Sequence, residues 1–110
     1  MKSDGLIRSQ KQEKRLEGKY DGQRSAASGA FWSRKGDVRT AMFLIEAKTT
    51  SNKSISVKKE WLEKIRREAI MDSRMPLLAL EIDGLNCVIL LEDDFDDLLE
   101  RACGRTEHDA

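Results

Sequence analysis

The sequence is poor in proline, cysteine, histidine and aromatic residues, and it contains no long apolar run. Its 110 residues include one proline, two cysteines, one histidine and 5% aromatic residues. No stretch has the length that an apolar helix needs to cross a membrane, and the first 15 residues lack the apolar middle of a secretory signal. We therefore expect a soluble cytoplasmic protein with no membrane partner, and a chain of this length predicts a single domain.

The two cysteines and the histidine offer little chemistry. Cys87 and Cys103 have neither a CxxC spacing nor nearby histidines, so neither a zinc site nor a disulfide framework is indicated. We expect both thiols to be buried and inert. His108 lies in a polar tail, where a solvated side chain is expected.

Charge is abundant and unevenly distributed. The formal net charge is zero, but residues 1–75 hold 18 basic and 10 acidic side chains, whereas residues 76–110 hold 2 and 10. The first part therefore carries +8 and the second −8. This split is typical of a basic face for a polyanion with an acidic end held away from it, and equally of two solvated helix surfaces of opposite sign.

Hydrophobic periodicity predicts one α/β domain over residues 1–110, with a central mixed sheet flanked by helices. Ser56 is a plausible N-cap of the second helix, and the Asp83-Gly84 pair predicts a tight hairpin turn. The expected elements are a charged helix over 3–19, strands within 28–50, a basic helix over 56–74, a β-hairpin over 77–91 and an acidic helix over 93–103.

The most apolar strand carries charges where burial is expected. In "KGDVRTAMFLIEAKTT", Glu46 and Lys48 lie two residues apart and so share one face of the strand, while Ile45 and Ala47 lie on the other. A buried charge needs a partner, a metal or water. If a turn near residues 39–41 folds the chain back, Asp37 comes to the same end of the sheet. Two close carboxylates resist joint ionisation unless a cation lies between them.

A divalent cation satisfies this requirement. Oxygen ligands suit Mg²⁺ or Mn²⁺, and the main-chain carbonyl of Ala47 adds a further oxygen to those of Asp37 and Glu46. Such an ion activates water and stabilises the charge of a displacement at phosphorus, while Lys48 orients the water or neutralises developing charge. The pattern therefore predicts metal-dependent phosphodiester hydrolysis. The competing interpretation is a surface salt bridge between Glu46 and Lys48.

The segment "GDV…FLIEAKTT" resembles the core of the PD-(D/E)xK nuclease superfamily, with Asp37, Glu46 and Lys48 at its three characteristic positions. The stretches "KQEKRLE", "SGAFWSRKGD" and "ISVKKEWLEKI" are similar to Holliday-junction resolvases of the archaeal and phage type. The resemblance covers about residues 9–82. It implies a restriction-endonuclease-like fold and a dimeric, Mg²⁺-dependent endonuclease that resolves branched DNA in a bacterial or phage-infected host cell.

The resemblance also implies further site residues. It places Glu13 of the first helix as a third acidic group of the metal site, although Glu17, one turn away, is an alternative for that role. It places Ser28 close to the scissile phosphate. For DNA contact we expect the basic residues near the site in sequence, which are Arg34, Lys35, Lys53, Lys58 and Lys59. The aromatic residues Phe31, Trp32 and Trp61 are expected in the core rather than stacked on bases.

Three other functions remain open at this point. The chain could be a less selective phage or bacterial nuclease on the same fold, a DNA-binding module of that fold without catalysis, or an interaction protein whose acidic last helix docks a partner. A dimer would place two sites on one four-way junction, and the apolar strands "LLALEI" and "NCVILL" are the predicted dimer surface.

Overall fold

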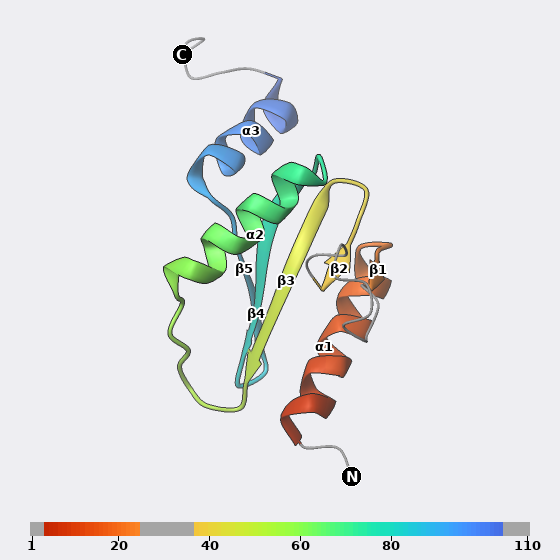
Figure 1. The fold of residues 1–110 in the computed structure, drawn as a ribbon, viewed down its shortest axis with the longest axis vertical. Helices are drawn as coiled ribbons and strands as arrows, with labels where there is room; N and C mark the ends of the chain where they lie inside the picture. Colours follow the sequence, from red (N-terminus) through yellow and green to blue (C-terminus); the bar gives the residue numbers. More distant parts are fainter. Residues whose placement is uncertain (1–3, 25–36, 105–110) are drawn as a thin grey trace.

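A computed structural model describes residues 4–24 and 37–104 of the chain. These residues form three helices and five strands, with three strands between the first two helices and two strands before the last (Figure 1). The order is α1 (Asp4–Lys19), β1 (Gln23–Arg24), β2 (Val38–Arg39), β3 (Phe43–Thr50), α2 (Lys59–Met71), β4 (Met75–Ile82), β5 (Leu85–Ile89) and α3 (Glu92–Cys103). The predicted class, a single α/β domain with a mixed sheet flanked by helices, is confirmed.

The five strands form one sheet in the order β1-β2-β3-β4-β5. The strands β3 and β4 pair in parallel, with Phe43 opposite Met75 and Thr50 opposite Ile82, and all other neighbours are antiparallel. A parallel pair needs a crossover connection, and α2 supplies it. The central position of β3 places its charged residues inside the domain rather than at an edge.

The helices α1 and α2 cover opposite faces of the sheet. Leu16 of α1 packs with Ile45 of β3 in one hydrophobic cluster, whereas Ile65 and Ala69 of α2 pack with Leu44 in a second cluster. Ile45 and Leu44 are consecutive strand residues and therefore point to opposite faces. Figure 1 shows α1 and α2 on either side of β3. Glu46 lies two residues after Leu44, so its side chain belongs to the α2 face.

Two turns fix the ends of these strands. Between β2 and β3, the Thr40 main-chain N–H donates to the Phe43 carbonyl at 2.8 Å, and the Phe43 N–H donates to Thr40 Oγ1 at 2.9 Å. Between β4 and β5, Asp83 and Gly84 have φ angles of +46° and +86°, a left-handed pair that asparagine, aspartate and glycine tolerate best. The predicted Asp83-Gly84 hairpin turn is therefore confirmed.

Gly22, between the end of α1 and the start of β1, packs closely against β2. A Cβ atom at this position would lie 2.8 Å from Val38 Cγ1 and 3.0 Å from the Arg39 carbonyl oxygen. Only glycine permits β1 to lie this close to β2. The short β1–β2 pair forms the edge of the sheet beside α1.

Several predicted details are wrong. The second helix begins at Lys59 rather than 56, its N-cap is Lys58 without a side-chain cap, and it ends at Met71. Cys87 and Cys103 are free and exposed rather than buried, because β5 is an edge strand and α3 packs loosely. Trp61 is half-buried and belongs to neither hydrophobic cluster.

The acidic helix α3 has no buried residue. Figure 1 shows it beyond one end of the sheet, opposite the end where the loop after β3 turns toward α2. Its apolar residues follow helical spacing, yet Phe95 and Leu99 remain 49% and 46% exposed. Within the described residues, no helix is both long enough and apolar enough to cross a membrane.

Candidate active site

The turn between β2 and β3 brings Asp37 beside the charged part of β3. Its main-chain N–H donates to the Ile45 carbonyl at 2.8 Å, and its Oδ2 accepts the main-chain N–H of Ala47 at 2.7 Å. A carboxylate bonded to a main-chain N–H is held in one position. Asp37 thus joins the middle of β3 at two points, on either side of Glu46, and the chain folds back at this turn as the sequence predicted.

Glu46 is one of two largely enclosed carboxylates of this region, the other being Glu68 of α2. Its side chain is 12% exposed, and burial together with the neighbouring Asp37 charge raises its pKa to about 7. The Lys64 and Lys48 ammonium groups oppose this shift, but they lie 3.6 and 3.8 Å from the carboxylate oxygens, beyond hydrogen-bond length. Desolvation and the repulsion from Asp37 and Glu68 therefore outweigh the attraction of the two ion pairs.

Lys48 lies between Glu46 and the indole of Trp61. Its Nζ is 3.8 Å from Glu46 Oε2 and 4.5 Å from the centroid of the Trp61 ring. The side chain is 31% exposed. An ammonium in this position borders both the Glu46 carboxylate and solvent.

A third carboxylate comes from α1. Glu13 is half-buried, and burial and the charge of Asp37 raise its pKa, against a lowering by Arg24. Glu17, the alternative from the sequence, instead accepts the Arg24 main-chain N–H at 3.1 Å and pairs with its guanidinium at 3.5 Å. Glu13 is therefore the α1 carboxylate whose pKa the charge of Asp37 raises, whereas Glu17 is hydrogen-bonded and ion-paired to Arg24.

Two side chains that the sequence did not single out hold the site together. Gln12 is 2% exposed and its Nε2 donates to the carbonyls of Lys48 (2.9 Å) and Ala79 (3.3 Å), which ties α1 to β3 and β4. Lys64 lies between Glu46 and Glu68, whose carboxylates are 3.6 and 3.8 Å away. Helical spacing could have revealed Lys64, because it is three residues from Trp61 and four from Glu68. No sequence signal distinguishes Gln12.

The predicted DNA-contact residues divide into two groups. Lys53, Lys58 and Lys59 are exposed in the loop after β3 and at the start of α2, and the Lys58 Nζ lies 5.9 Å from the Trp61 ring that also contacts Lys48. The second group lies outside the described residues, together with Phe31 and Trp32. That group consists of Ser28, Arg34 and Lys35.

The donor chemistry fits a divalent cation bound by few protein ligands. In residues 4–24 and 37–104, no three His, Cys, Asp or Glu side chains are arranged as a group that could hold a metal ion. Mg²⁺, however, keeps several waters and commonly uses one or two carboxylates plus substrate phosphate oxygens. Asp37 and Glu46 are such a pair, since the charge of Asp37 raises the pKa of Glu46. The main-chain N–H of Ala47 points toward Asp37. In a strand, the carbonyl of a residue points to the same edge as its N–H, so the Ala47 carbonyl also faces the Asp37 side of β3.

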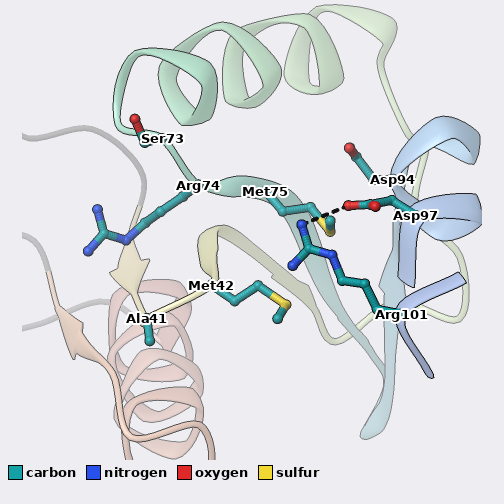
Figure 2. A pocket seen from close by; sticks show the side chains of 8 residues that line it. All are labelled: Ala41, Met42, Ser73, Arg74, Met75, Asp94, Asp97 and Arg101. Atoms are coloured by element: carbon teal, nitrogen blue, oxygen red, sulfur yellow. Dashed lines mark ion pairs between the residues drawn. The ribbon is translucent and has the colours of Figure 1, made fainter. Parts of the chain in front are cut away.

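A separate cavity of about 510 Å³ lies under α3. Figure 2 shows Asp97 and Arg101 of α3 paired at its rim, with Met42 and Met75 extending toward them and Arg74 pointing away. Arg74 donates instead to the Thr40 carbonyl at 2.7 Å and to Asp72 Oδ2 at 2.7 Å. This cavity contains none of the residues predicted for catalysis.

Comparisons of this chain with protein-family models, with curated proteins and with solved structures found no match.

Proposed function

We propose that this chain is a metal-dependent DNA endonuclease of the PD-(D/E)xK type that acts on branched DNA. The observation that supports this most directly is the position of Asp37, Glu46 and Lys48. Two carboxylates, one of which raises the pKa of the other, come from neighbouring segments of the sheet and lie beside a partly exposed ammonium on β3. A structural salt bridge would need one carboxylate and one lysine, whereas here the charges of Asp37 and Glu68 act on Glu46 together with those of Lys48 and Lys64, so three carboxylates face two lysines.

The residues have distinct roles in this proposal. Asp37, Glu46 and the Ala47 carbonyl would hold Mg²⁺ or Mn²⁺, with Glu13 as a further acidic group near Asp37. The ion, when bound, would lower the pKa of a water and stabilise charge on the scissile phosphate. Lys48 would orient the attacking water and offset the added negative charge on the phosphate oxygens. Gln12 would keep the strand carrying Lys48 fixed against α1.

Charge distribution favours a nucleic acid as the substrate. Lys48, Lys53, Lys58 and Lys59 belong to β3, the loop after it and the start of α2, whereas the acidic α3 lies beyond the opposite end of the sheet (Figure 1). A phosphate backbone can approach the first region without meeting the α3 carboxylates. The lysines of β3, of the loop after it and of the start of α2 are thus separated in space from the acidic helix α3.

We expect DNA binding to weaken steeply with salt, because lysine–phosphate contacts release counterions. The double change of Lys58 and Lys59 to alanine should flatten the plot of log affinity against log salt by about one unit for each phosphate that is no longer bound. Fluorescence anisotropy of a labelled duplex at several salt concentrations measures this slope. Arg101→Gln on α3 is the matched control and should leave it unchanged. An unaltered slope in the double variant would remove the start of α2 from the interface.

A junction resolvase must nick two strands, so we propose a homodimer with two sites on one DNA surface. The predicted dimer surface needs correction, because the apolar residues of β4 from Met75 to Leu80 are buried by the chain's own helices. Exposed apolar side chains remain on β5 and elsewhere. They include Leu85, Val88, Phe95, Leu99, Ile70 and Met71.

The function is tested by incubating the chain with a labelled four-way junction and with the matching linear duplex, with and without Mg²⁺. We expect Mg²⁺-dependent nicks at symmetry-related positions of opposing strands and a preference for the junction. Sedimentation at the same protein concentration should show a dimer. A monomer that cuts both DNAs equally would leave a less selective nuclease, and binding without cleavage under any metal would leave a DNA-binding module.

A further inference from the structure

Trp61 lies between two lysines at the edge of the candidate site. The Nζ atoms of Lys48 and Lys58 are 4.5 and 5.9 Å from the centroid of its ring. An ammonium within about 6 Å of an indole ring is attracted to its electron-rich face. The ring therefore has an electrostatic role that its half-buried position alone does not suggest.

The other contact of Lys48 is too weak to fix its ammonium group. The distance from Nζ to Glu46 Oε2 is 3.8 Å, and Glu46 also pairs with Lys64 at 3.6 Å. A lysine head on a flexible four-carbon stem samples many positions unless a contact restrains it. The indole is a rigid surface on a helix that packs against β3, so it can supply that restraint.

We propose that Trp61 is a positioning residue, whose indole face holds the Lys48 ammonium beside Glu46 where the scissile phosphate arrives. This inference rests on the proposed nuclease function and deepens it. Trp61 acts through Lys48 on the chemical step and adds little to DNA affinity. The competing roles are a packing residue of the core and a platform for an opened base. Trp61 lies outside both hydrophobic clusters, which opposes a core role, and the Lys48 ammonium lies 4.5 Å from its ring centroid, where a stacked base would compete with it.

Two substitutions separate these roles. Trp61→Leu keeps an apolar side chain but removes the aromatic face, whereas Trp61→Phe keeps a smaller aromatic face. We expect kcat on the DNA substrate to fall about tenfold in Trp61→Leu with KM within about twofold, and to recover to within about threefold in Trp61→Phe. Leu62→Val is the control for altered α2 packing, since Leu62 lies about 100° further round the helix. It should leave kcat unchanged.

A spectroscopic measurement detects the contact without DNA or metal. Protons on the carbon next to Nζ of Lys48 should lie over the indole and show an upfield ring-current shift by NMR. The shift should vanish in Trp61→Leu and persist in part in Trp61→Phe. A lysine signal at its ordinary position in the unchanged chain would overturn the proposal.

The kinetic outcomes distinguish this inference from the function on which it rests. An active chain whose Trp61→Leu variant keeps full kcat would overturn the positioning role alone. A raised KM with unchanged kcat would also overturn it and identify the ring as a DNA contact. If the unchanged chain cleaves no DNA with Mg²⁺ or Mn²⁺, the proposed function fails and this inference fails with it.

Discussion

Replacing Lys48 by methionine is expected to lower the cleavage rate by about two orders of magnitude or more, while DNA binding stays largely intact. The loss falls on the transition state, because the ammonium then no longer offsets the negative charge that develops on the phosphate oxygens. Methionine keeps an unbranched stem beside Trp61, so the change removes charge rather than packing. Single-turnover cleavage of a labelled junction, together with binding in Ca²⁺ or without metal, measures the two effects separately.

Removing the charge of Asp37 or of Glu46 should also lower the cleavage rate and leave DNA binding largely intact, but for a different reason. Asp37→Asn retains an amide oxygen that can accept the Ala47 N–H, and Glu46→Gln retains the shape of the side chain, yet both remove a charge that would hold the metal. Glu63→Gln, on an exposed position of α2, is the control and should cleave normally. A Lys48→Met variant that cuts at the normal rate would show that the charged strand is not a nuclease site.

Metal affinity is expected to fall by about two orders of magnitude between pH 8 and pH 5, because Glu46 binds a cation only when ionised. Burial and Asp37 raise the pKa of Glu46 to about 7, so its carboxylate gains a proton across this range, whereas an ordinary glutamate would remain charged for most of it. Calorimetric titration with Mn²⁺ at several pH values checks the dependence. A flat profile above pH 5 would contradict it.

Lys64 is expected to shift the position of this transition, which burial and Asp37 mainly determine. Several charged groups act on Glu46: Lys64 and Lys48 lower its pKa, and Asp37 and Glu68 raise it, while Glu13 of α1 interacts with Asp37. Lys64→Met removes one lowering charge, so the pKa of Glu46 should rise and the midpoint of metal binding should move to higher pH. Tighter binding at every pH with an unmoved midpoint would contradict this and show that Lys64 acts mainly as a competitor of the metal for the carboxylate.

Local sequence patterns determined much of this fold. The strands around Asp37 and Glu46 were predictable because a short turn joins them and a short apolar run, Met42 to Ile45, begins the second strand. The hairpin after β4 was predictable because Asp83 and Gly84 tolerate positive φ. The start of α2 was not, because Ser56 is a good cap by type but the chain turns into the helix only at Lys58.

Features set by tertiary contacts were beyond the sequence patterns. The exposure of Cys87 follows from the edge position of β5, and strand order cannot be read from hydrophobicity. The contact of Gln12 with the carbonyls of Lys48 and Ala79 depends on how α1 crosses the sheet. Likewise, the choice between Glu13 and Glu17 was open in the sequence and depends on the position of Arg24.

The enclosure of Glu46 also affects the stability of the folded chain. An unfolded chain ionises this glutamate near its ordinary pKa of 4.5, whereas the folded chain does so only near 7. The folded state therefore holds a proton that the unfolded state has released between these values, so this group favours folding at low pH and the benefit disappears as pH rises through about 7. At neutral pH, the ionised site reduces the free energy of unfolding, as is common where function requires close like charges. A divalent ion bound between Asp37 and Glu46 would reverse that loss, so under the proposed function added metal should raise the temperature at which this chain unfolds.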